Sequence, residues 1–169
     1  SYLTSCNNLE KLKALSISAR IACLLVDIER NAEAEILLDQ TIQHLGTLDD
    51  HYVRLKANCL FHKNALLCSE NKTQEARVAT ARLKTTLSLL KLWGKYPDVH
   101  RITHRSFNPS FLFIKPSFLL AVSYDNLSTA YSKQGKFLTS LRYADLAMDE
   151  YSKNPLAFNT HEAFILFNN

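Results

Sequence analysis

Apolar residues recur at intervals of three and four along most of the chain, the spacing that places them on one face of an α-helix. The clearest case lies between residues 9 and 29. Its apolar positions are Leu12, Leu15, Ala19 and Ala22, with Ile17, Ile21, Leu24, Leu25 and Ile28 widening the stripe. This stripe predicts a long, well-buried helix. No segment alternates cleanly between apolar and polar residues, so no β-strand is expected.

Breaks in this pattern divide the chain into seven predicted helices. The predicted ranges are 9–29, 32–45, 49–68, 75–93, 117–134, 137–152 and 156–167. Gly46, Gly94 and Gly135 fall between predicted helices, and Pro155 suits the first turn of the last one. Residues 94–116 lose the helical period and contain three prolines, so a long loop is expected there.

The composition agrees with one soluble domain built from helices. The chain has 169 residues, 47% of them hydrophobic, and only three glycines for the tight turns that a many-stranded fold needs. No run approaches 18 consecutive apolar residues, so we expect a soluble protein without a membrane partner. The spacing of the four cysteines suits reduced thiols, which favours an intracellular address in the cytoplasm or nucleus. The first residue, Ser1, and the apolar end of the chain suggest a subunit or a fragment of a longer helical array.

Residues 121–154 form a 34-residue segment that closely resembles a tetratricopeptide repeat along its whole length. The likeness is carried by residues at the packing positions of the family: Tyr124, Leu127, Ala130, Tyr131, Gly135 and Ala147. Ser128 and Ser140 stand at the usual glycine and alanine, where small side chains let helices approach closely. Ala144 replaces a large aromatic residue, with Tyr143 beside it, and Ser152 replaces the closing proline.

Weaker copies of the repeat fit the two preceding helix pairs. Their second-helix alanines, Ala34 and Ala76, are 42 residues apart (76 minus 34), and the next equivalent, Ser140, follows 64 residues later (140 minus 76). The resemblance implies an all-α fold over residues 1–169, in which antiparallel helix pairs 9–45, 49–93 and 117–152 stack as a solenoid before one C-terminal helix.

In the resembling family, first helices line a concave groove that receives a peptide or a helix of a partner protein. Carried over to this chain, the groove residues are Arg20, Cys23, Asp27, Leu60, Phe61, Asn64, Val122, Asp125, Asn126, Thr129 and Lys133. We therefore expect a scaffold or adaptor that binds another protein. Neighbouring repeats of a larger assembly are a second class of partner.

A basic segment supports an alternative function, the binding of nucleic acid or another anionic surface. Its residues are Lys91, Lys95, His100, Arg101, His104 and Arg105. The net charge of +4 is otherwise spread along the chain, without the long Lys/Arg run that marks a nucleic-acid arm. An H-x-x-x-H pair without further ligands does not make a zinc site, so no metal is expected.

Catalytic chemistry is not expected from the remaining candidates. Cys59 and His62 fall on one apolar helix face, but no acidic residue is placed to orient the imidazole, so core packing is the expected role. The four cysteines lack zinc or disulfide spacing and are expected to be reduced thiols. No glycine-rich phosphate loop or catalytic triad order occurs, and the chain is expected to need no cofactor.

Overall fold

The computed structural model describes residues 2–46, 52–93 and 116–153. Within these ranges the chain forms six helices and no β-strand, which confirms the all-helical prediction for this part of the chain. The helices are α1 (Tyr2–Asp27), α2 (Asn31–Gly46), α3 (Val53–Ser69), α4 (Thr73–Trp93), α6 (Pro116–Lys133) and α7 (Phe137–Ser152).

The helix ends agree with the sequence pattern at most places. One difference is α1, which begins at Tyr2 and not near residue 9, because no glycine or proline in residues 2–8 interrupts the helix. The predicted start of the third helix at residue 49, most of the predicted loop 94–116 and the predicted last helix 156–167 lie outside the described residues.

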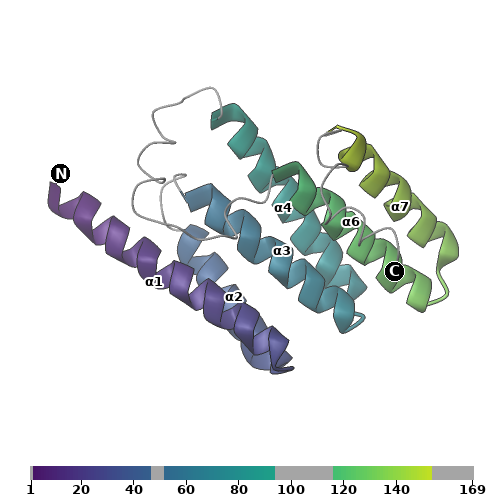
Figure 1. The fold of residues 1–169 in the computed structure, drawn as a ribbon, viewed down its shortest axis with the longest axis horizontal. Coiled ribbons are helices and arrows are strands. Elements are labelled where there is room, and N and C mark those ends of the chain that lie inside the picture. The colour runs from purple at the N-terminus through teal and green to yellow at the C-terminus, as the bar shows by residue number, and fades with distance from the viewer. Residues whose placement is uncertain (1, 47–51, 94–115, 154–169) are drawn as a thin grey trace.

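The helices pack as three consecutive pairs: α1 with α2, α3 with α4, and α6 with α7. These pairs follow one another across the molecule from the N-terminus (Figure 1). Each later pair meets the one before it through its first helix, because α3 packs on α2 and α6 packs on α4. The first helices also touch in order, α1 with α3 and α3 with α6.

Polar bonds accompany these contacts between pairs. The ammonium of Lys63 in α3 pairs with Asp39 of α2. Lys72, in the turn after α3, pairs with Glu35 of α2 at 2.8 Å. The side-chain amide of Gln134, in the turn after α6, donates to the carbonyl oxygen of Asn71 at 3.1 Å. The turns of the second and third pairs therefore lie next to each other.

All three helix pairs turn through a residue with a left-handed backbone. These residues are Glu29 (φ 61°), Asn71 (φ 60°) and Gly135 (φ 73°). They are separated by 42 and 64 positions, the same offsets that relate the second-helix alanine positions in the sequence. Only glycine adopts this conformation without strain, and asparagine tolerates it better than glutamate does.

The hydrogen bonds around the three turns also repeat. The N–H groups of Arg30, Lys72 and Lys136 donate to the carbonyl oxygens of Leu25, Leu67 and Tyr131 at 2.8, 2.9 and 3.0 Å. The N–H of each left-handed residue donates to the carbonyl three positions earlier, at 3.0, 3.1 and 2.9 Å. Together these bonds form the Schellman motif that ends many helices. The three turns thus give an unambiguous register between the pairs.

Small side chains occupy equivalent positions in the first and third helix pairs. Ala22 and Ala34 occupy these positions in the first pair and are fully buried. In the third pair the hydroxyl oxygens of Ser128 and Ser140 lie 3.1 Å apart and share a hydrogen bond. The serines therefore preserve the close approach that was expected of small residues there.

The last pair is packed by aromatic rings. Tyr131 and Ala147 are buried, as predicted. The ring of Tyr143 stacks on that of Tyr131, with centroids 5.5 Å apart and an interplanar angle of 2°. Ala144 stands where the repeat has a large aromatic residue, and the ring of the adjacent Tyr143 provides aromatic packing there instead.

Candidate functional site

The turn register identifies equivalent residues on the three first helices. Arg20, Cys23 and Asp27 lie nine, six and two residues before Glu29, the left-handed residue of the first turn. Counting back in the same way from the other two turns selects His62, Ala65 and Ser69 on α3 and Asn126, Thr129 and Lys133 on α6. We call these nine residues the first-helix face.

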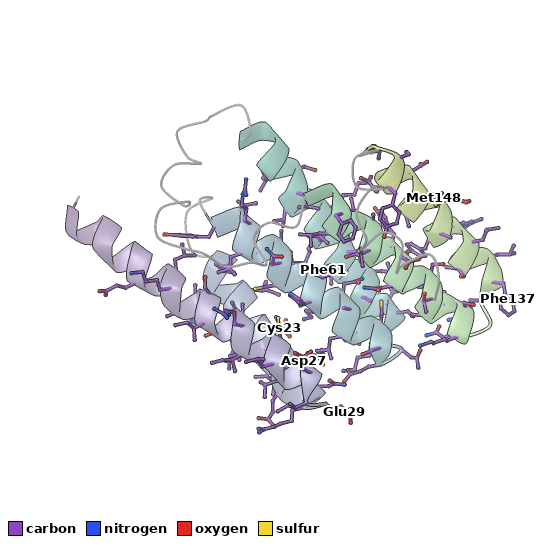
Figure 2. All side chains as sticks on the ribbon, viewed as in Figure 1. Cys23, Asp27, Glu29, Phe61, Phe137 and Met148 are labelled. Carbon is purple, nitrogen blue, oxygen red and sulfur yellow. The ribbon has the colours of Figure 1, made fainter. Side chains whose placement is uncertain are left out.

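The first-helix face is accessible along its length. Arg20, Asp27, Ser69, Thr129 and Lys133 are exposed. Cys23, His62, Ala65 and Asn126 are half-buried. Because α1, α3 and α6 touch in that order, these residues lie on three helices that follow one another. Cys23 and Asp27, which belong to this face on α1, are labelled in Figure 2, as is Phe61 of α3, the residue before His62.

The structure corrects the residues predicted for α3 and one of those for α6. Leu60 and Asn64 are fully buried, and Val122 is buried on α6, so none of the three offers a binding surface. Leu60 lies eleven residues before its turn, as Tyr124 does, and both pack in the core. Phe61 and Asp125 are half-buried and lie at the border of the face.

The prediction missed His62, Ala65 and Ser69. The offsets of 42 and 64 residues relate Ala34, Ala76 and Ser140 of the second helices. Adding 42 to the α1 residues Arg20, Cys23 and Asp27 would have selected these three positions on α3. The α3 segment instead contains other apolar residues that fit a loose repeat pattern at a shifted register.

Asn64 is the centre of a buried polar network between three helices. Its amide nitrogen donates to the hydroxyl of Thr80 on α4 at 2.8 Å and to the carbonyl of Ser123 on α6 at 3.4 Å. Its amide oxygen accepts from the amide nitrogen of Asn126 at 3.2 Å. Asn126 therefore links the first-helix face to the core, and its substitution would disturb both.

The electrostatics of the face favour neutral side chains at its middle. Burial lowers the pKa of His62, and the nearby carboxylate of Asp27 partly opposes this change. Burial and the same carboxylate raise the pKa of the Cys23 thiol. His62 is therefore neutral and Cys23 protonated near neutral pH. The charges that remain are of both signs, which does not suit a polyanion.

The other cysteines are also poor nucleophiles. Burial, with a smaller effect of Cys23, raises the pKa of Cys59 to about 12. Burial alone raises the pKa of Cys68 to about 12. Both thiols stay protonated at neutral pH, and a thiol attacks and binds metals mainly as the thiolate. Within the described part of the chain, no three His, Cys, Asp or Glu side chains gather closely enough to hold a metal ion.

Most of the predicted anionic site falls outside the described residues. Lys91 belongs to α4. The other five residues, Lys95, His100, Arg101, His104 and Arg105, lie in the segment 94–115, of which the structure gives no description. This alternative therefore stays a prediction.

Two further findings bear on function. Among the helices of residues 2–46, 52–93 and 116–153, none has the length and apolar character needed to cross a membrane. Comparison of the chain with family models, with curated proteins and with solved structures finds no match in any of the three.

Proposed function

We propose that this chain is a non-catalytic tetratricopeptide-like module that binds a segment of a partner protein on the first-helix face. The observation that carries the proposal is the repetition of one turn at residues 29, 71 and 135, each time with a left-handed residue at the same place and the same pattern of hydrogen bonds. Helix pairs repeated with one turn geometry are typical of solenoids, which bind partners along an extended surface.

The packing order also supports this proposal. Each new pair docks its first helix on the second helix of the pair before it, and the first helices form a continuous row. A solenoid built in this way presents equivalent residues of successive first helices to one ligand. The resemblance of residues 121–154 to a tetratricopeptide repeat agrees with this arrangement.

The chemistry of the face suggests the kind of ligand. Cys23, His62 and Ala65 offer half-buried, mostly neutral surface in the middle, whereas Arg20, Asp27 and Lys133 carry charges of both signs around it. Such a surface suits a peptide or a helix with a few apolar anchors and both acidic and basic flanking residues. Binding held by apolar anchors should depend only weakly on salt.

The experiment that tests the proposal introduces a photo-crosslinking amino acid at one position at a time. At Thr129, exposed on the first-helix face, we expect crosslinks to a discrete partner, to be identified by mass spectrometry. Val78, exposed on α4, a helix that contributes no residue to the face, is the matched control position and should give none. Equal labelling from both positions would contradict a binding function of this face.

The identified partner then allows a quantitative test. Thr129→Arg and Lys133→Glu should each weaken binding by about tenfold or more, while melting as the parent does, because surface substitutions usually change stability by about 0.5 kcal/mol or less. Asn126→Ala is unsuitable, since Asn126 donates to buried Asn64. If only Arg101→Glu with Arg105→Glu weakens binding, and salt does so steeply, the basic segment is the site instead.

A further inference from the structure

An apolar stripe runs along the outer side of the first helix pair. Ile17, Ile21 and Leu24 of α1, with Ile28 directly after it, are between 45% and 62% exposed. Their spacing of four, three and four residues places them on one helix face. Four neighbouring large aliphatic side chains on one face, each about half exposed, suit an interface better than a solvated surface.

The turn register shows what covers this face in the other pairs. The equivalents are Cys59, Lys63, Leu66 and Glu70 in α3, and Ser123, Leu127, Ala130 and Gln134 in α6. Of these, Cys59, Leu66, Ser123, Leu127 and Ala130 are 2% exposed or less. Lys63 pairs with Asp39 of α2, the second helix of the preceding pair. The face that is open on α1 is therefore the face that α3 and α6 use to dock on a preceding second helix.

The other end of the described chain carries the matching face. Phe137, Leu138, Leu141 and Met148 of α7 are between 50% and 80% exposed. The α2 residues equivalent to Leu141 and Met148 are Glu35 and Ile42. Glu35 pairs with Lys72 of the next pair, and Ile42 is buried. Leu141 and Met148 thus lie on the side by which α2 meets the following first helix, whereas the equivalent α4 residues, Arg77 and Lys84, are exposed. Phe137 and Met148 mark the two ends of this side of α7 in Figure 2.

We propose that the α1 stripe of one molecule packs on this side of α7 in a second copy of the chain, so that copies continue the array head to tail. The contact would be a further instance of the one already made by α2 with α3 and by α4 with α6. Asp145 of α7 stands where Asp39 stands in α2, and Arg20 lies next to the α1 position equivalent to Lys63. Apolar side chains then meet apolar side chains, with opposite charges beside them.

A contact between two different faces does not close on itself after two copies. The mean mass of the full 169-residue chain should therefore rise with concentration past that of a dimer, as measured by sedimentation velocity and light scattering. Leu24→Glu on α1 and Leu141→Glu on α7 should each abolish this growth, weakening association by about tenfold or more, which is about 1.4 kcal/mol or more. Both side chains are exposed, so each variant should melt as the parent does.

The decisive measurement mixes the two variants in equal amounts. Each variant keeps one intact face, so the mixture should form a one-to-one dimer that grows no further. Val78→Glu, an equally exposed apolar position on α4, is the matched control and should associate as the parent does.

Three results would overturn the proposal. A parent that is monomeric at all concentrations shows that the α1 stripe and the α7 side of two copies do not associate. If Leu141→Glu associates as the parent does, α7 is not part of the contact, and the copies meet symmetrically through α1. A mixture that fails to dimerise shows that the two faces do not bind each other. Leu24 and Leu141 lie outside the first-helix face, so none of these results depends on partner binding there.

Discussion

Replacing Asn64 by alanine tests whether the buried network holds the second and third helix pairs together. The two shorter bonds, to Thr80 at 2.8 Å and from Asn126 at 3.2 Å, are each worth about 1 kcal/mol net. The bond to the carbonyl of Ser123 at 3.4 Å is weak and adds little. The void left by the amide adds about 1 kcal/mol. We therefore expect Asn64→Ala to lower the free energy of unfolding by about 3 kcal/mol.

The same helix provides a matched control. Asn58 is also buried, but its amide nitrogen donates to the carbonyl oxygen of Arg54 within α3, at 3.1 Å. Its amide oxygen finds no partner among the described residues. Asn58→Ala makes the same change of side chain and leaves a similar void, but it breaks one bond within α3 and removes a buried oxygen that has no partner, which offsets part of the loss. It should therefore lower the free energy of unfolding by less than about 1 kcal/mol.

Urea unfolding followed by circular dichroism, with fluorescence as a second probe of two-state behaviour, measures both variants. A double-mutant cycle of Asn64→Ala with Asn126→Ala should show a coupling of about 1 kcal/mol, because the two amides bond to each other. If Asn64→Ala lowers the free energy of unfolding no more than Asn58→Ala does, the bonds of Asn64 to the other helices contribute nothing and the predicted role of the network is wrong.

Three other predictions can be checked by the same unfolding measurements. Ala147→Asp should lower the free energy of unfolding by on the order of 3 kcal/mol or more, because it buries an unpaired charge. Met148→Asp, at the exposed neighbouring position, should lower it far less, and equal losses would mean that the assignment of buried and exposed positions on α7 is wrong. Glu29→Gly should raise the free energy of unfolding by up to about 1 kcal/mol, because glycine adopts the left-handed backbone without strain. Gly135→Ala should lower it by about as much through backbone strain alone, since no atom lies within 4 Å of the added methyl group. The lowered pKa of His62 means that the unfolded chain binds a proton more readily than the folded chain, so stability should fall as pH drops below about 6.5, and less so in His62→Gln.

Much of the local structure could be predicted from the sequence, because helix periodicity and turn residues act over a few positions. The apolar spacing located α2, α6 and α7 closely, and Gly135 marked the turn between α6 and α7. The repeat-like segment also placed Tyr131 and Ala147 in the core. In that pair the resemblance predicted several packing positions at once, although it placed the buried Val122 in the groove.

The candidate site was predicted less well where the repeat is weak. On α3 the prediction selected Leu60, Phe61 and Asn64, and two of these are fully buried. A helix position changes its face by about 100° with each residue, so an error of one or two positions exchanges core for surface. Glycine marks the turn of the third pair only, and nothing in the sequence around Glu29 indicates that this glutamate adopts a left-handed backbone.

The sequence by itself determined that the chain is helical, where most helices begin and end, and that they come in pairs, because these follow from local spacing. Only the tertiary structure decided which residues of each helix meet the next pair, because that depends on side chains far apart in the sequence. Asn64 bonds to Asn126, which lies 62 positions further along the chain (126 minus 64). Its polar amide is tolerated in the core only because hydrogen bonds to the neighbouring helices satisfy it. The stripe of Ile17, Ile21 and Leu24 looks in sequence like any other core stripe. It is exposed because no preceding second helix lies against it within the described residues, as α2 and α4 lie against α3 and α6.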